Sequence, residues 1–172
     1  MSAADHALPT VPDDSFLRSL NEATTRAVAT APALTSPHRG AEDDIRQAVV
    51  DAVDGYADDL IALSRDLHAH PEEAFAEHEA VRMVTDLLTA HGHAARIGVG
   101  GLATALVASA GKAGGPHVAV LAEYDALPGI GHGCGHNIIC ATAVGGFLGA
   151  ASVASRVGGR VSLIGTPAEE GG

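Results

Sequence analysis

Apolar residues recur every three or four positions in two segments of the chain, and this spacing predicts two helices. The first spans residues 45 to 67 and presents one apolar face, formed by Ile45, Val49, Val53, Tyr56, Leu60, Leu63 and Leu67. Acidic residues 42–44 favour its start through the helix dipole, and Pro71 ends it. The second helix runs from about Glu77 to His91, with Val81, Val84, Leu87 and Leu88 on one face.

The hydrophobic period changes after Gly92, and short apolar segments bounded by glycine predict strands. These segments are 102–109, 117–122 and 160–165. Between the last two lies an uncharged stretch, 138–155, which approaches the length of a membrane span. Small residues dominate it, so a buried helix packed closely against a sheet is the better interpretation. The order helix, helix, strand, strand, helix, strand indicates a layered α/β domain.

The first 40 residues differ from the rest of the chain. They are rich in Ala, Thr, Pro and Ser with weak periodicity, so we expect a disordered N-terminal extension followed by a catalytic domain over 41–172. Phe16, Leu17 and Leu20 could start a short helix within the extension. No basic start followed by an apolar run marks a secretory signal, and we expect a cytoplasmic protein.

Composition and charge narrow the classes of partner. Hydrophobic residues make up 47% of the chain, which is typical of a globular protein. The formal net charge of −11 argues against nucleic acid or an anionic membrane as a partner. Two cysteines are too few for a disulfide framework.

Three segments with metal-binding side chains follow strands or open a helix, where α/β folds place their chemistry. They are 123–128, 131–137 and 166–172. In the second, glycines beside Cys134 and His136 let the backbone turn tightly, so that a thiolate and an imidazole can converge on one divalent ion. The alternative is a buried cysteine near an unrelated loop histidine.

The third segment contains the adjacent carboxylates Glu169 and Glu170. One can bind a metal while its neighbour takes a proton from an activated water, which divides the work of metal-assisted hydrolysis. The alternative is a solvated acidic turn. In the first segment, Asp125 could orient a ligand histidine through its free ring nitrogen, or could form an Asx-type turn before Pro128.

Taken together, Asp125-Ala-Leu-Pro, Cys134-Gly-His136 and Pro167-Ala-Glu-Glu170 resemble the aminoacylase and carboxypeptidase G family of metallo-amidohydrolases and dipeptidases. The longer run from Glu123 to Asn137 is similar to the branch containing p-aminobenzoyl-glutamate hydrolase and β-alanyl-lysine dipeptidases. The segment 67–72 matches as well, so the resemblance covers roughly 45 to 172.

The resemblance implies a role for each matched residue. Cys134, His136 and Glu170 are implied to be metal ligands, Glu169 the general base that also passes the proton to the leaving amine, and Asp125 the support of the metal site. It also implies two divalent ions, zinc or manganese, a small amide or dipeptide substrate, and a homo-oligomer in full-length relatives. His68, His70 and His132 match family positions without a ligand role, and Asn137 is expected to cap a helix.

The resemblance further implies a helix–sheet–helix domain of the zinc-peptidase type that is incomplete here. In the family, more histidine ligands and a lid domain follow the position of Gly172, so we expect an N-terminal fragment. Two functions stay open: hydrolysis of dipeptides or N-acyl amino acids, and a truncated, inactive metal-binding remnant. A third, a redox or nucleophilic Cys134, is disfavoured because no cationic partner lies near it in sequence.

Overall fold

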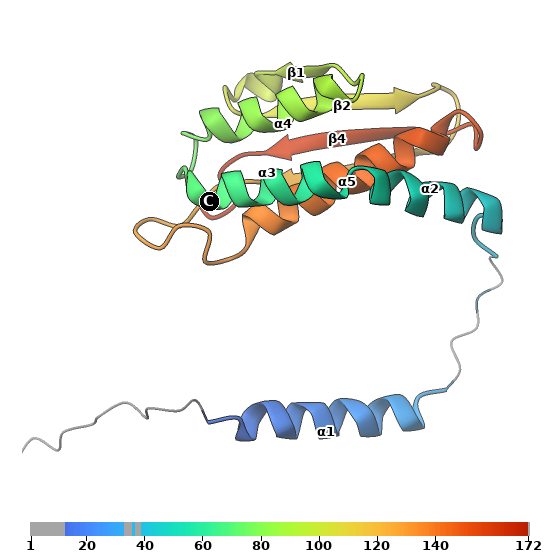
Figure 1. Ribbon diagram of the computed structural model, residues 1–172, viewed down its shortest axis with the longest axis vertical. Coiled ribbons are helices and arrows are strands. Elements are labelled where there is room, and N and C mark those ends of the chain that lie inside the picture. Colours follow the sequence, from blue (N-terminus) through green and yellow to red (C-terminus); the bar gives the residue numbers. More distant parts are fainter. Residues whose placement is uncertain (1–12, 33–35, 37–38, 172) are drawn as a thin grey trace, which may run out of the picture. The chain divides into compact units, whose positions relative to one another are not determined.

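The computed structural model describes residues 13–32, 36 and 39–171, which belong to two compact units, 1–40 and 41–172 (Figure 1). In the first unit, helix α1 (Ser15–Thr30) has no buried residue. Ion pairs one turn apart, Arg18 with Asp14 and Arg26 with Glu22, support it. The short helix that Phe16, Leu17 and Leu20 could start is therefore present, while the disorder of the extension stays a prediction and residues 1–12 lie outside the described part of the chain.

In the second unit three helices are followed by three strands, a helix and a fourth strand, and its α/β class is confirmed by the similar structures reported below. In chain order its elements are α2 (Asp43–Gly55), α3 (Ala57–Ala69), α4 (His78–Ala90), β1 (Ala95–Ile97), the 3-10 turn η1 (Val99–Gly101), β2 (Leu106–Gly111), β3 (His117–Glu123), α5 (His136–Ala154) and β4 (Arg160–Thr166).

The single helix predicted over residues 45 to 67 is divided into α2 and α3. Tyr56 separates them with φ −103° and ψ 3°, and Gly55, a weak helix former, comes directly before it. The Tyr56 ring packs edge-on against His91, with centroids 4.6 Å apart. Apolar spacing continues across the break, which is why the pattern alone predicts one helix. The pattern also missed β1, which has only three residues, and began β2 four residues too early.

The four strands form one sheet in the order β1-β2-β4-β3. Strands β3 and β4 are parallel, in register from His117 opposite Arg160 to Glu123 opposite Thr166, while the other two pairs are antiparallel. Helix α5 is the crossover that a parallel pair requires. The carboxyl ends of β3 and β4 and the first turn of α5 therefore meet at one edge of the sheet.

The hydrophobic core lies between one face of the sheet and the helices α3, α4 and α5, which share a single cluster of buried residues. Helix α5 is long and apolar enough to cross a membrane, but 61% of its most apolar window is buried inside this fold, as in a core helix. In the described residues the helices cover one face only. The second helical layer expected from a helix–sheet–helix arrangement is not among them.

Two glycines of α5 allow a direct test of this packing. A methyl group added at Gly149 would lie 2.8 Å from Val53 Cγ2, whereas one at Gly146 would meet nothing within 4 Å. Both changes to alanine favour the helix by about 0.5–1 kcal/mol. We expect Gly146→Ala to raise the free energy of unfolding by that amount and Gly149→Ala to lower it by about 1–3 kcal/mol through overpacking. Urea denaturation measures both, and equal shifts would contradict the packing of α2 on α5.

Candidate metal centre

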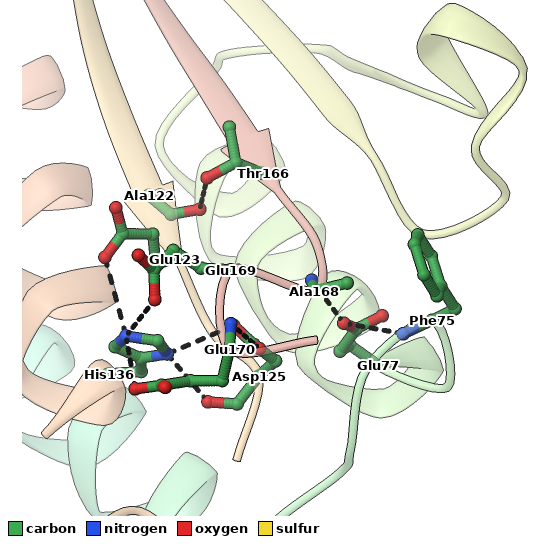
Figure 2. A network of polar contacts seen from close by, with 10 residues as sticks. All are labelled: Phe75, Glu77, Ala122, Glu123, Asp125, His136, Thr166, Ala168, Glu169 and Glu170. Carbon is green, nitrogen blue, oxygen red and sulfur yellow. Dashed lines mark hydrogen bonds and ion pairs between the residues drawn. The ribbon is translucent and has the colours of Figure 1, made fainter. Parts of the chain in front are cut away.

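Side chains from all three predicted segments meet at the carboxyl edge of β3 and β4 (Figure 2). Glu123 ends β3, and Asp125 follows two residues later. His136 is the first residue of α5. Glu169 and Glu170 come from the loop after β4. Gly135, with φ 86°, makes the sharp turn between Cys134 and His136 in a conformation that L side chains resist.

His136 lies at the middle of the group and is only 4% exposed. Its Nδ1 lies 2.8 Å from the carbonyl oxygen of Asp125 and 3.1 Å from Asp125 Oδ1. Both partners are acceptors, so the ring donates from Nδ1, and a neutral imidazole then has its lone pair on Nε2. The contact fixes the tautomer that a metal ligand of this kind needs.

Three carboxylates surround the free nitrogen of His136. Nε2 is 3.5 Å from Glu123 Oε2, 3.7 Å from Glu169 Oε2 and 3.9 Å from Glu170 Oε1. In the part of the chain that the structure describes, no Lys or Arg pairs with these carboxylates. Like charges this close repel unless a cation neutralises them. An imidazole nitrogen beside carboxylate oxygens is a donor set that zinc and related divalent ions accept, so the residues fit a metal.

Glu123 is the residue that sequence reasoning missed. Glu123, His136 and Glu169 each offer one potential ligand atom, and these three atoms lie within 4.8 Å of one another. Glu123 is the first residue of the run 123–137 that carries the resemblance, but no role was predicted for it. Its position as the last residue of β3, opposite Thr166 in the parallel pair, was the available signal, but it required knowing that β3 and β4 are neighbours.

Cys134 is exposed and lies outside this tight group. The nearby Glu170 side chain, followed by burial and the charges of Glu170, Glu169 and Asp125, raises the pKa of the Cys134 thiol. A thiol with a raised pKa is a poor nucleophile at neutral pH, which weighs against the redox or nucleophilic alternative. A bound cation would reverse the local charge and favour the thiolate.

The predicted residues are therefore neighbours, but their separate roles stay predictions. Asp125 contacts His136, and its Oδ2 accepts the backbone N–H of Glu170 at 2.9 Å. Glu169 and Glu170 lie at nearly equal distances from His136 Nε2, so geometry does not separate base from ligand.

Two further sequence expectations concern neighbouring residues. Asn137 is not the helix cap, because Gly135 holds that position; its side chain donates instead to Ser64 Oγ at 3.0 Å and so links α5 to α3. His132 is 9% exposed, burial lowers its pKa, and its Nδ1 has no hydrogen-bond partner among the described residues.

Comparison with known proteins identifies the family. No family model matches the chain. It is 38% identical over 141 residues to the Xaa-Arg dipeptidase of Mus musculus, and 30% identical over 151 residues to a component of the p-aminobenzoyl-glutamate hydrolase of Escherichia coli strain K12. These matches cover 74% and 75% of this chain, and 33% and 31% of the relatives.

A solved structure agrees with these relatives. The crystal structure of a dinuclear metal-binding peptidase of the M20 family from Bacillus subtilis matches with a TM-score of 0.59 and 28% identity, over 73% of this chain and 36% of that one. The chain therefore has homologues in the M20 family of peptidases and amidohydrolases over about three quarters of its length, which confirms the resemblance seen in the three motifs. It spans about a third of the length of the relatives it matches.

The double contact of Asp125 leads to a prediction. In Asp125→Asn, the amide group can accept from His136 Nδ1 or from the Glu170 amide, but not from both with its single oxygen. We expect the affinity for a divalent ion to fall about 10–100-fold while the far-UV circular dichroism is unchanged. Calorimetric titration with Zn²⁺ or Mn²⁺ measures this. Asp58→Asn, on the exposed side of α3, is the matched control and should bind metal like the wild type.

Proposed function

We propose that this chain carries part of the catalytic centre of a metal-dependent hydrolase that cleaves amide or peptide bonds in small substrates, dipeptides or N-acyl amino acids. The observation that carries the proposal is the environment of His136. Its ring is held by Asp125 and its free nitrogen faces three carboxylates that have no cationic partner in the described residues. The names of the relatives, a dipeptidase and a hydrolase, support the same class of reaction.

The residues divide into ligands and a base. His136, Glu170 and Cys134 are the proposed ligands, with Glu123 close enough to join them. Two divalent ions, zinc or manganese, would supply Lewis acidity when bound, polarising the substrate carbonyl and making water more acidic. Asp125 keeps the proton of His136 on Nδ1, so Nε2 stays available as a donor.

Glu169 is the proposed proton carrier. Its side chain is 51% exposed, so water and substrate can reach the carboxylate from solvent. One oxygen would take a proton from the attacking water and then give it to the nitrogen of the leaving amine, which departs neutral.

A second candidate function is metal binding without turnover. It is favoured by one observation: the chain spans about a third of the length of its relatives, whose activities belong to the whole proteins. Both candidates predict that the centre binds metal, so turnover alone separates them.

The separating experiment uses Glu169→Gln. We expect hydrolysis of dipeptides and N-acyl amino acids in the presence of Mn²⁺ or Zn²⁺ to fall about 10²–10⁴-fold, because glutamine cannot accept a proton. Metal affinity should change little. Glu22→Gln, on the exposed helix α1, is the matched control.

Each result has a separate meaning. A wild-type rate no greater than that of Glu169→Gln, with metal bound to both, would favour the inactive remnant. A wild type that binds no divalent ion would contradict the metal centre itself.

A further inference from the structure

We propose that Glu77 is a positioning residue of the metal centre: one buried carboxylate holds in place the two chain segments that carry the proposed ligands and base. The inference rests on the proposed function of that centre. Glu77 is absent from the ligand group and lies at the start of α4, on a different element from every ligand. It is fully buried, at 0% exposure.

The Glu77 carboxylate is satisfied by three donors. Oε1 accepts the backbone N–H of Phe75 at 3.0 Å and that of Ala168 at 2.8 Å. Oε2 accepts the hydroxyl of Thr104 at 2.7 Å. Figure 2 shows the carboxylate between Phe75 and Ala168, on the side of the loop away from His136. A buried carboxylate is tolerated only with such partners, so the contacts are specific to an acceptor of this length.

The two amides that share Oε1 belong to strained residues. Phe75 has φ 62° and Ala168 has φ 59°, and in the described residues these are the non-glycine positions with positive φ. Side chains other than glycine resist this region, so each conformation needs outside support. Both residues present their N–H to the same oxygen, which makes Glu77 the common support of two unfavourable backbone turns.

One of these turns determines where the acidic pair lies. Ala168 comes directly before Glu169 and Glu170, so its backbone angles set the direction in which both leave β4. The N–H of Glu170 then donates to Asp125 Oδ2, and Asp125 holds His136. Glu77 is thus connected to the imidazole through the loop after β4.

A second chain of hydrogen bonds links Glu77 to the residues at the end of β3. The Tyr124 hydroxyl donates to the carbonyl oxygen of Thr104, whose own hydroxyl donates to Glu77. Tyr124 is fully buried and stands directly between Glu123 and Asp125. One carboxylate therefore braces the ends of both parallel strands, and its loss should disturb ligand positions that it does not itself touch.

Two substitutions separate the effect of side-chain length at position 77 from the effect of its charge. Glu77→Asp keeps the charge and a residue favoured at helix starts, but it is one methylene too short to reach Ala168 as well as Phe75. Glu77→Gln keeps the length and one oxygen that can accept both amides, and its NH₂ group can donate to the Thr104 hydroxyl. If Glu77 positions the loop, glutamine should preserve the site and aspartate should not.

The first measurement is titration of the 172-residue chain with Co²⁺, followed by visible absorbance. We expect Glu77→Asp to weaken Co²⁺ binding about 10–100-fold and Glu77→Gln to stay within about threefold of the wild type. Glu72→Gln is the matched control: Glu72 accepts the N–H groups of Glu79 and Ala80 at the same end of α4, whereas the Ala168 N–H donates to Glu77. It should alter stability without altering Co²⁺ binding.

The second measurement needs no metal. Amide hydrogen exchange of the metal-free chain, followed by NMR, should show the Ala168 and Glu170 amides exchanging about tenfold faster or more in Glu77→Asp, while the interior of α5 stays protected. Unchanged exchange at both amides together with unchanged Co²⁺ affinity would overturn the proposal. So would a loss of binding in Glu72→Gln as large as in Glu77→Asp, because that would make the effect one of general stability.

The two measurements keep this inference separate from the proposed function. A wild type that binds no Co²⁺ would contradict the metal centre, while the exchange rates would still decide whether Glu77 holds the loop. If Glu77→Asp fails to fold, Glu77→Gln against Thr104→Val decides instead. Thr104→Val removes one of the three donors and preserves the side-chain shape, and we expect it to speed exchange at Ala168 severalfold more than Glu77→Gln does.

Discussion

The parallel pairing of β3 with β4 is the constraint on which the rest of the site depends. Two parallel strands end at the same edge of a sheet, and the chain between them must return over one face to start the second strand. Helix α5 is that return, so its first turn comes to the edge where β3 and β4 end. His136, Asp125 and the Glu169–Glu170 pair are far apart in sequence and become neighbours through this one pairing.

Bringing these groups together is costly for the fold, and the packing beneath the site offsets that cost. Carboxylates crowd around His136, and a left-handed Ala168 adds about 1–3 kcal/mol of strain. Below them, β4 approaches the core closely at Gly165, where a methyl group would lie 2.8 Å from the Tyr124 hydroxyl. Tyr124 is fully buried there, so the strained loops leave the sheet beside a closely packed part of the core.

The sequence predicted those features that depend on local pattern. Helix α5, strands β3 and β4 and the site residues Asp125, Glu169 and Glu170 around His136 follow from apolar runs, glycines and short motifs. The break at Tyr56 could not be predicted, because apolar spacing continues through it. Glu123 and Glu77 were missed as site residues for a related reason: each acts through partners distant in sequence, and only the sheet order brings those partners together.

The site combines buried side chains joined by hydrogen bonds with exposed ones, and this division fits the proposed metal centre. His136 and Asp125 are buried and joined by hydrogen bonds, and the backbone of Glu170 is tied to the same carboxylate. Cys134 and the Glu169 carboxylate are exposed. The Glu170 side chain, burial and the neighbouring carboxylates raise the pKa of the Cys134 thiol, so metal binding through this proposed ligand would release a proton. In the proposed centre the exposed groups would adjust to an ion, while the buried half already presents the Nε2 nitrogen of His136 beside the carboxylates.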